Sequence, residues 1–266
     1  MSIRHYTPRR RLIGVSDRAK ILLSLSIALY IGLNISYPLV HGSVLDAITI
    51  ATIYCGALAM LIHADLAYGR VYAGRFFFIV LFGGYLIELM GVHTTWPFGV
   101  YEYDRSLGVA LFGVPILVPF AWILMCHPVL VVARKIAPRW VFLYGGVLLA
   151  TWDYFLDPQM VDAGRWSWSD ITSSLPGTPD IPLSNFFGWM LAGCALMGLL
   201  NVALPHDSKK EGLSNKYVTV FLTWVLFSAV VGNLFFFDRP LVGVISLLTF
   251  GALLAPYLFK TWLGEN

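Results

Sequence analysis

Charged residues are scarce in this chain: only 12% of its 266 residues are Asp, Glu, Lys or Arg, whereas 58% are hydrophobic. Soluble domains contain roughly 25% charged residues, so this chain has too little charge to cover a surface exposed to water. The mean hydropathy is +0.73. This shortage of charge excludes an ordinary soluble protein and predicts an integral membrane protein.

Cysteine is also rare, and phosphate-binding loops are missing. The three cysteines, Cys55, Cys126 and Cys194, lie in separate apolar runs, and neither a Cys-x-x-Cys pair nor a cysteine–histidine cluster occurs. The pattern predicts packing residues rather than disulfides or a zinc site. Because the sequence also lacks a glycine-rich phosphate loop, we expect no nucleotide, flavin or metal cofactor.

A cleavable secretory signal is not evident either. The basic start RHYTPRRR (residues 4–11) precedes a long apolar stretch without a clear small-residue cleavage site. We find no soluble domain, low-complexity tract or internal repeat, so we expect residues 1–266 to form a single integral membrane domain. The net charge of +3 does not indicate a nucleic-acid partner, because its uneven distribution has another explanation.

Long apolar runs are what the chain has in abundance. A membrane-spanning helix needs about 20 mostly apolar residues. Eight runs qualify: residues 19–40, 44–65, 71–91, 108–133, 138–157, 184–205, 216–237 and 240–260. They predict an all-α polytopic membrane helix bundle with about eight transmembrane helices. Three prolines, Pro115, Pro119 and Pro128, predict a kink in the fourth.

The basic residues alternate with these runs in a way that predicts orientation. All but three of the 18 Lys and Arg fall on one side, the exceptions being Arg105, Arg165 and Arg239. Cytoplasmic loops are enriched in Lys and Arg, so we expect both termini in the cytoplasm of a multi-pass protein in the cell membrane. Most acids, and the two longest loops, fall on the opposite, outer side.

Two of the acids inside predicted spans, Glu88 and Asp153, are of particular interest. At about 1.5 Å per residue, Glu88 and Asp153 both rise about 20 Å from the basic residues Arg75 and Arg139, and so reach a similar depth. Acids within the membrane usually face the bundle interior. In one dry pocket, two acids can divide their roles into a neutral donor and an ionised acceptor. The alternative is that each acid reaches for water or an arginine at the interface.

A third acid, Asp157, follows Asp153 by one helical turn on the same face. This DxxxD spacing could hold Mg²⁺ on a diphosphate, as in membrane prenyltransferases. Those enzymes have a second acidic motif, which is missing here, and their motif faces the cytoplasm, whereas this pair lies at the outer end. We therefore expect no metal site.

The histidines have more than one interpretation. His93 leaves the third span shortly after Glu88, where it could relay a proton or only cap the helix. His127 precedes Pro128, and we expect it to bond a backbone carbonyl freed by the proline kink. His63 ends the second span, where we expect it at the inner interface.

Aromatic residues are dense in the outer half, and most suit the aromatic belt of membrane proteins. Trp152, next to Asp153, and Trp189, a turn inside the sixth span, are better candidates for a pocket. Asn185 opens the sixth span and either caps it or presents an amide to a substrate.

Four blocks of sequence carry a resemblance. They occur in this order: GVHTTWPFGVYEYDRSLG (91–108), GVPILVPFAWILM (113–125), TWDYFLDPQMVDAGRWSW (151–168) and IPLSNFFGW (181–189). They resemble the membrane carotenoid-biosynthesis family that includes bisanhydrobacterioruberin hydratase and bacterial lycopene or γ-carotene hydratases. The resemblance implies cofactor-free addition of water to the terminal C=C of an acyclic C40 or C50 carotenoid, which gives a tertiary alcohol. It also implies association with other carotenoid-pathway enzymes.

This chemistry suits the acids already singled out. A buried carboxylic acid can protonate the alkene, and a carboxylate can take a proton from the incoming water. We expect Asp153 to be the proton donor and Glu88 the water-activating partner, or the reverse, with His93 and Asp157 tuning protonation. Six further residues are expected to form the pocket for the carotenoid end: Trp96, Tyr101, Tyr103, Trp152, Asn185 and Trp189.

A lipid-soluble polyene is expected to enter sideways from the membrane lipid, through a groove between spans, with water arriving from the outer side. Two other functions remain open at this point. A carotenoid cyclase would use the same protonation but exclude water. A membrane transporter would use the acids as an ion pathway.

Overall fold

The computed structural model describes residues 14–206, 213 and 215–264. Its described part contains eight long helices: α1 Asp17–Ser36, α2 Gly42–Tyr68, α3 Arg70–Thr94, α4 Val118–Ile136, α5 Val141–Asp162, α6 Leu183–Ala203, α7 Lys216–Phe235 and α8 Pro240–Trp262. The short elements are the 3-10 helices η1 Tyr37–Leu39 and η2 Arg105–Leu107 and the strands β1 Tyr101–Tyr103, β2 Ala110–Leu111, β3 Val114–Pro115 and β4 Trp166–Trp168. Strand β1 pairs with β4, and β2 with β3, both antiparallel.

Seven of the helices in the described residues are long and apolar enough to cross a membrane, namely α1 to α4 and α6 to α8. The protein is therefore an all-α, multi-pass membrane bundle, as predicted. The expected fifth span, α5, does not meet this measure. Its second half carries Asp153, Asp157 and Asp162, and most of its residues are buried against neighbouring helices rather than facing lipid.

The fourth run differs from the prediction of one kinked helix over residues 108–133. Residues 108–117 form a β2–β3 hairpin, and α4 begins only at Val118. Phe112 (φ 48°) and Gly113 (φ 85°) adopt left-handed backbone conformations that break a helix. Pro119 then lies at the start of α4, where its missing N–H costs no hydrogen bond. Only Pro128 remains inside the helix.

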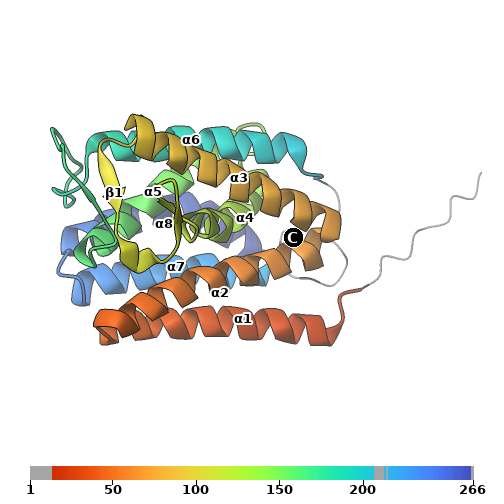
Figure 1. The fold of residues 1–266 in the computed structure, drawn as a ribbon. Helices are drawn as coiled ribbons and strands as arrows, with labels where there is room; N and C mark the ends of the chain where they lie inside the picture. The colour runs from red at the N-terminus through yellow and green to blue at the C-terminus, as the bar shows by residue number, and fades with distance from the viewer. Residues whose placement is uncertain (1–13, 207–212, 214, 265–266) are drawn as a thin grey trace, which may run out of the picture.

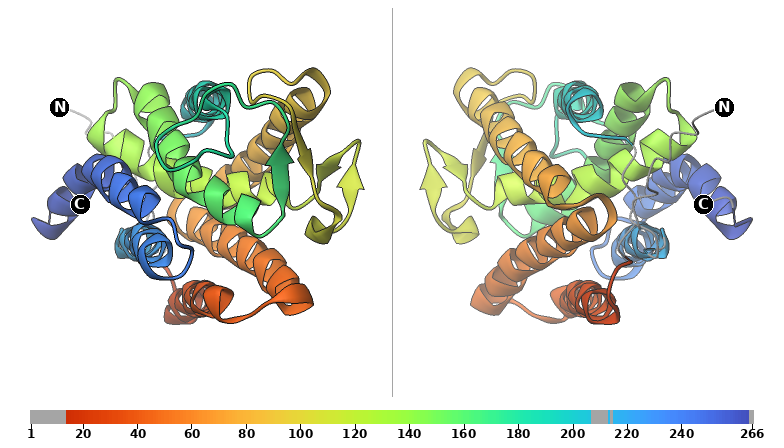
Figure 2. Two further views of the ribbon diagram at one scale, coloured as in Figure 1. Left: turned by 90° about the vertical axis from the view of Figure 1, so that its left-hand side faces the viewer. Right: turned by 90° about the vertical axis from the view of Figure 1, so that its right-hand side faces the viewer.

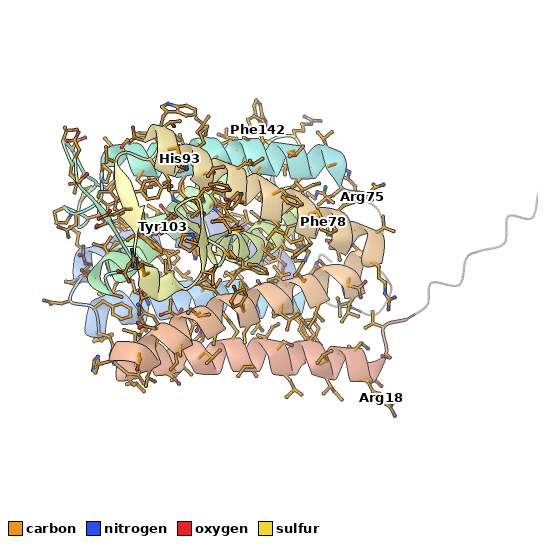
Figure 3. All side chains as sticks on the ribbon, viewed as in Figure 1. Arg18, Arg75, Phe78, His93, Tyr103 and Phe142 are labelled. Atoms are coloured by element: carbon orange, nitrogen blue, oxygen red, sulfur yellow. The ribbon has the colours of Figure 1, made fainter. Side chains whose placement is uncertain are left out.

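The helices lie roughly side by side, so the bundle has two ends (Figure 1). Helix α1 begins and α8 ends at one of them, called here the terminal end. The strands and the long loops lie toward the other, the strand end. Arg18 and Arg75 lie at the terminal end and Tyr103 toward the strand end (Figure 3). The predicted basic residues 4–11 and 209–210 lie outside the described residues.

Helix α4 runs through the middle of the bundle (Figure 2), and every residue from Trp122 to Ala133 is buried. Helices α5 and α6 pack closely through two glycines. A Cβ added at Gly193 would lie 3.0 Å from the Cα of Gly146, and one added at Gly146 would lie 2.6 Å from the backbone nitrogen of Cys194. Glycine at both positions therefore allows the close approach that brings Asn185 to the acids of α5.

The two histidines of the inner half contradict the sequence-based expectations. His63 is buried rather than interfacial, and His127 bonds His63 rather than a freed carbonyl, with 2.8 Å between His63 Nδ1 and His127 Nε2. One nitrogen of this pair must donate and the other accept. The pairing arises because α2 and α4 are neighbours that pack along their length.

Candidate functional site

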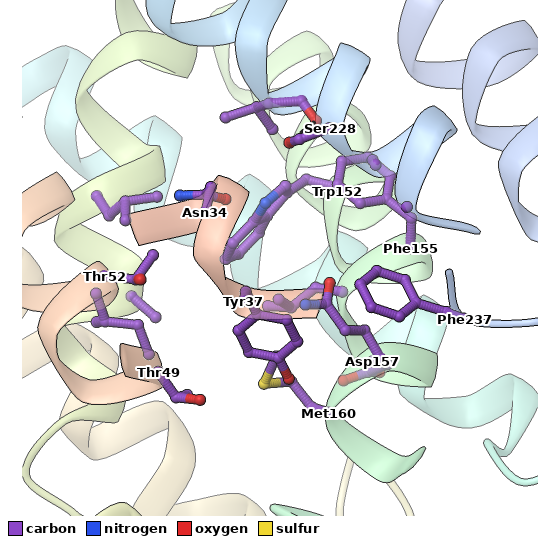
Figure 4. Close-up of a pocket in the computed structure, with 18 of the residues that line it drawn as sticks. Asn34, Tyr37, Thr49, Thr52, Trp152, Phe155, Asp157, Met160, Ser228 and Phe237 are labelled. Carbon is purple, nitrogen blue, oxygen red and sulfur yellow. Dashed lines mark hydrogen bonds between the residues drawn. The ribbon is translucent and has the colours of Figure 1, made fainter. Parts of the chain in front are cut away.

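A cavity of about 360 Å³ lies between the helices in the strand-end half. Figure 4 shows its side chains converging from several elements, with Thr49 and Thr52 of α2 on one side and Asp157 of α5 and Phe237 on the other. The lining is mostly apolar and aromatic, as in most small-molecule sites. Within the described residues, two carboxyl groups reach its wall, those of Glu88 and Asp157.

Glu88 is buried in α3 and accepts hydrogen bonds on both carboxyl oxygens. Its Oε2 accepts from the hydroxyls of Tyr101 (2.9 Å) and Tyr103 (2.7 Å). Its Oε1 accepts from the indole Nε1 of Trp122 at 3.0 Å. An ionised carboxylate can only accept hydrogen bonds, so a group surrounded by three donors is suited to the ionised form.

The β1–β4 ladder places these donors. Tyr101 lies opposite Trp168 and Tyr103 opposite Trp166. Side chains alternate along a strand, so both tyrosines of β1 point to the same face. On the neighbouring strand, Trp166 donates from Nε1 to Asp157 Oδ1 at 3.1 Å. A two-stranded sheet of six residues thus holds both carboxyl groups of the cavity.

The two tyrosines keep their protons. Burial is the main cause that raises the pKa of Tyr101 and of Tyr103 well above the ordinary value of 10.0, and the nearby Glu88 charge raises both further. The two hydroxyls therefore act as neutral donors to Glu88 across the whole physiological pH range.

Asp153 and Asp157 share one amide. The Nδ2 of Asn185, from α6, lies 3.0 Å from Asp153 Oδ2 and 2.5 Å from Asp157 Oδ2. The two carboxyl groups are also close enough to hydrogen-bond one another. Two carboxyl groups that share one buried site cannot both ionise without a large repulsion, so the pair retains a proton. Asp157 faces the cavity, whereas Asp153 lies behind it, and its Oδ1 has no hydrogen-bond partner among the described residues.

Three indoles form an aromatic wall. Trp122 stacks on Trp189 with 4.2 Å between ring centroids and 9° between planes. Trp152 meets Trp189 edge-on, with 5.8 Å between centroids. All three line the cavity. Stacked indole faces can stabilise a cation in a site shielded from water.

Most of the predicted site residues meet at this cavity. The lining includes Glu88, Tyr101, Tyr103, Trp152, Asp157, Asn185 and Trp189. Asn185 is not the helix cap, because α6 begins at Leu183 with Pro182 before it. Asp153 is joined to the site through Asn185 but does not line the cavity.

Two predicted residues lie away from it. His93 is exposed, and its Nε2 lies 3.1 Å from the carbonyl oxygen of Phe112. On an α-helix, five residues after Glu88 correspond to a rotation of about 140°, so His93 faces away from the carboxyl group. Trp96 is 57% exposed, beyond the left-handed turn at Thr95.

Sequence reasoning missed two residues that contact the acids. Trp122 lies in an apolar run that gives no sign of a polar partner, although it stands in the second of the four sequence blocks. Trp166 is one of the outer-half aromatic residues that the sequence does not distinguish from an aromatic belt, yet it donates to Asp157. Their common signal is an indole N–H in a buried setting, which usually has an acceptor.

No cluster of three or more His, Cys, Asp and Glu side chains suited to a metal ion lies in the described parts of the chain. Three polar atoms in the cavity wall, Tyr37 Oη, Thr52 Oγ1 and Trp224 Nε1, are buried without a hydrogen-bond partner among these residues. They suit a small polar guest such as water, which needs a few polar partners.

Comparison with known proteins identifies the family of this chain. A bisanhydrobacterioruberin hydratase from Haloarcula japonica is 30% identical over 138 residues, which are 48% of this chain and 45% of the relative. The match thus spans less than half of that relative's length. No solved structure matches. The family model described as carotenoid biosynthesis protein matches residues 48–253, which include Glu88, Asp157 and Asn185. Because this match covers more than half of the chain, the protein belongs to the carotenoid biosynthesis protein family.

Proposed function

We propose that this protein is a carotenoid hydratase, an enzyme that adds water to the terminal C=C of an acyclic C40 or C50 carotenoid and yields a tertiary alcohol. One observation carries the proposal. Asp157, which shares the Asn185 amide with Asp153, and Glu88, whose carboxyl group is held by three donors, line the same apolar, aromatic cavity. The name of the Haloarcula japonica relative supports the same reaction.

The first step is protonation of the alkene. The Asp157 carboxyl group transfers its proton to the less substituted alkene carbon, which forms a C–H bond and leaves a tertiary cation. Asp157 is the donor because it lies in the cavity wall. Asp153 acts through it, since the two share the Asn185 amide. The donor role first expected of Asp153 thus belongs to the pair.

The cation is then captured by water. The water oxygen bonds to the tertiary carbon, and a water proton passes to the Glu88 carboxylate. One proton has left the aspartate pair and one has reached Glu88, so the net change is the addition of one water molecule once that proton returns to the pair. The faces of Trp122, Trp152 and Trp189 stabilise the cation between the two steps.

Water is the reactant that separates this proposal from a cyclase, which would quench the same cation internally. The unpartnered atoms of Tyr37, Thr52 and Trp224 offer hydrogen bonds to water within the cavity. None of these steps uses a cofactor. The protein lies in the cell membrane with its basic terminal end on the cytoplasmic side, so the cavity lies toward the outer leaflet. Enzymes of the same pathway are the expected partners in the membrane.

Expression in a lycopene-producing host, followed by mass analysis of the pigments, tests the proposal. A new pigment that is heavier than its precursor by one water molecule supports hydration. A new pigment of unchanged mass indicates a cyclase. If no new pigment forms in this host or in one that supplies C50 carotenoids, both the hydratase and the cyclase are contradicted. A membrane transporter is then the remaining function.

A further inference from the structure

The cavity has an opening on the lipid-facing side of the bundle. Among the described residues of its lining, the exposed ones are Ile35 (52%) and Leu39 (65%) beside α1 and Phe227 (54%) and Phe236 (53%) on the α7 side. The cavity is not fully enclosed, and the exposed residues of its wall mark where it opens. The cavity therefore opens between α1 and α7, at a site called here the α1–α7 mouth.

Two aromatic contacts frame this mouth. On its inner side Tyr30 stacks on Phe221, with 4.8 Å between ring centroids. On its strand-end side Tyr37 meets Phe237 edge-on at 6.0 Å. These contacts tie α1 to α7, which lie at the edge of the bundle (Figure 2). Ile35 lies between the two contacts in the first segment, and Phe227 and Phe236 lie between them in the second, while Leu39 follows Tyr37 by two residues.

The chemistry of the rim matches lipid rather than water. All four exposed residues of the lining are apolar, and α1 and α7 are both long and apolar enough to cross a membrane. Inside the mouth, the cavity continues to Trp152 and Asp157 of α5 and to Glu88 of α3. An apolar molecule that moves in from the bilayer would therefore meet the carboxyl groups within the cavity.

We propose that the α1–α7 mouth admits one end of an acyclic isoprenoid polyene, while the rest of the molecule stays in the surrounding lipid. This inference rests on the proposed function. The cavity has the size of a site for a small ligand, so it holds an end of the polyene and not the whole extended chain. Entry end-first delivers the terminal C=C, the bond that is hydrated, to Asp157.

Site-specific photo-crosslinking tests the mouth. A diazirine-bearing amino acid replaces Ile35 in one variant and Phe227 in another, both in the full-length protein in membranes of a lycopene-producing host. Matched controls carry the same group at Leu29 on α1 (55% exposed) and Val220 on α7 (50% exposed), which do not line the cavity. After illumination, the protein is purified under denaturing conditions and its covalently bound polyene is measured by absorbance.

We expect polyene attachment at positions 35 and 227 to exceed that at 29 and 220 several-fold. Equal attachment at all four positions, or attachment of colourless membrane lipid alone at 35 and 227, overturns the proposal. Attachment requires binding but no turnover. Selective attachment without any alcohol product would therefore support entry through the mouth and contradict the hydratase activity. An alcohol product without selective attachment would support the hydratase activity and contradict entry through the mouth.

Discussion

Tyr103 and Trp166 face each other across the β1–β4 ladder, and each donates a hydrogen bond to a different buried carboxyl group. The Tyr103 hydroxyl lies 2.7 Å from Glu88 Oε2, and the Trp166 Nε1 lies 3.1 Å from Asp157 Oδ1. A short pair of strands outside the helices thus fixes acids from α3 and α5 around one cavity.

Removal of the proton from the aspartate pair should abolish hydration. Asp157→Asn cannot protonate the alkene, and loss of a positioned general acid costs about 10²–10⁴-fold in rate. Asp153→Asn should also lose most activity, because the new amide can donate to Asp157 and hold it as a carboxylate. Pigment analysis of host cells measures both, with the exposed loop variant Asp170→Asn as the control. Full activity in Asp153→Asn would remove that residue from the mechanism.

Glu88→Gln should remove the acceptor of the water proton. The amide of glutamine also brings a donor to a site where three donors already point, so at least one N–H or O–H loses its partner. Such a loss costs about 1–3 kcal/mol of stability. Product formation should fall about 100-fold or more while the protein still inserts. Glu102→Gln, on the same sheet but exposed, should match the wild type. Wild-type product levels in Glu88→Gln would refute its role as base.

Tyr103→Phe should weaken, but not abolish, the reaction. Glu88 then keeps the donors Tyr101 and Trp122 but loses one hydrogen bond to its charge, worth about 1.5–3 kcal/mol. We expect a fall of roughly 10–100-fold in the initial rate. Tyr85→Phe is the matched control, because its hydroxyl bonds the carbonyl of Leu111 outside the cavity. Equal effects of both changes would show that loss of a tyrosine hydroxyl acts generally rather than through Glu88.

The raised pKa values of Tyr101 and Tyr103 predict an alkaline limit to stability. Below pH 10 both phenols are protonated in the folded and the unfolded protein, so they cause no pH dependence. Above the ordinary pKa of 10.0 the unfolded chain releases these protons first, so the free energy of unfolding falls as the pH rises. Thermal unfolding in detergent should show a flat midpoint up to about pH 10 and a decline beyond it. In Tyr103→Phe the decline should be shallower, and an unchanged slope would contradict burial as the cause.

Gly193→Ala should disturb the site from a distance. The added methyl group would lie 3.0 Å from the Cα of Gly146 and force α5 and α6 apart, at a cost of about 1–3 kcal/mol. Asn185 would then lose its contact with the two aspartates, so product should fall with stability. Gly74→Ala, on α3 with no atom within 4 Å of the added Cβ, should instead stabilise by about 0.5–1 kcal/mol. Equal unfolding temperatures for both variants would contradict the close packing.

The fold was predictable where the signal was local. Apolar runs of about 20 residues predicted the helices, because each stretch that crosses a bilayer must satisfy this requirement alone. The prediction of a helix over residues 108–117 was wrong, because an apolar composition suits a hairpin equally well. The left-handed backbone conformations of Phe112 and Gly113 favour the hairpin over the helix. The fifth predicted run formed the helix α5, which is less apolar than the other seven because neighbouring helices bury most of its residues and so relax the demand for apolar side chains.

The site was predictable only in part. Glu88 and Asp153 stood out because acids within apolar runs are costly and so need a reason, and Asp157 stood out because it follows Asp153 by one helical turn. The sequence could not show that Asp157 rather than Asp153 lines the cavity, because both project from nearly the same face of α5. His93 was included for its nearness in sequence to Glu88, but the helical rotation turns it outward.

By itself, the sequence determined that this protein is a membrane protein, the approximate positions of its helices, and the end of the bundle at which most acids lie. Each of these follows from the composition of continuous segments. The tertiary structure alone decided which side chains meet: Tyr103 with Glu88, Trp166 with Asp157, and Asn185 with both aspartates. These contacts join different elements, namely β1 with α3, β4 with α5, and α6 with α5. They depend on how helices pack and strands pair, which no single stretch of sequence encodes.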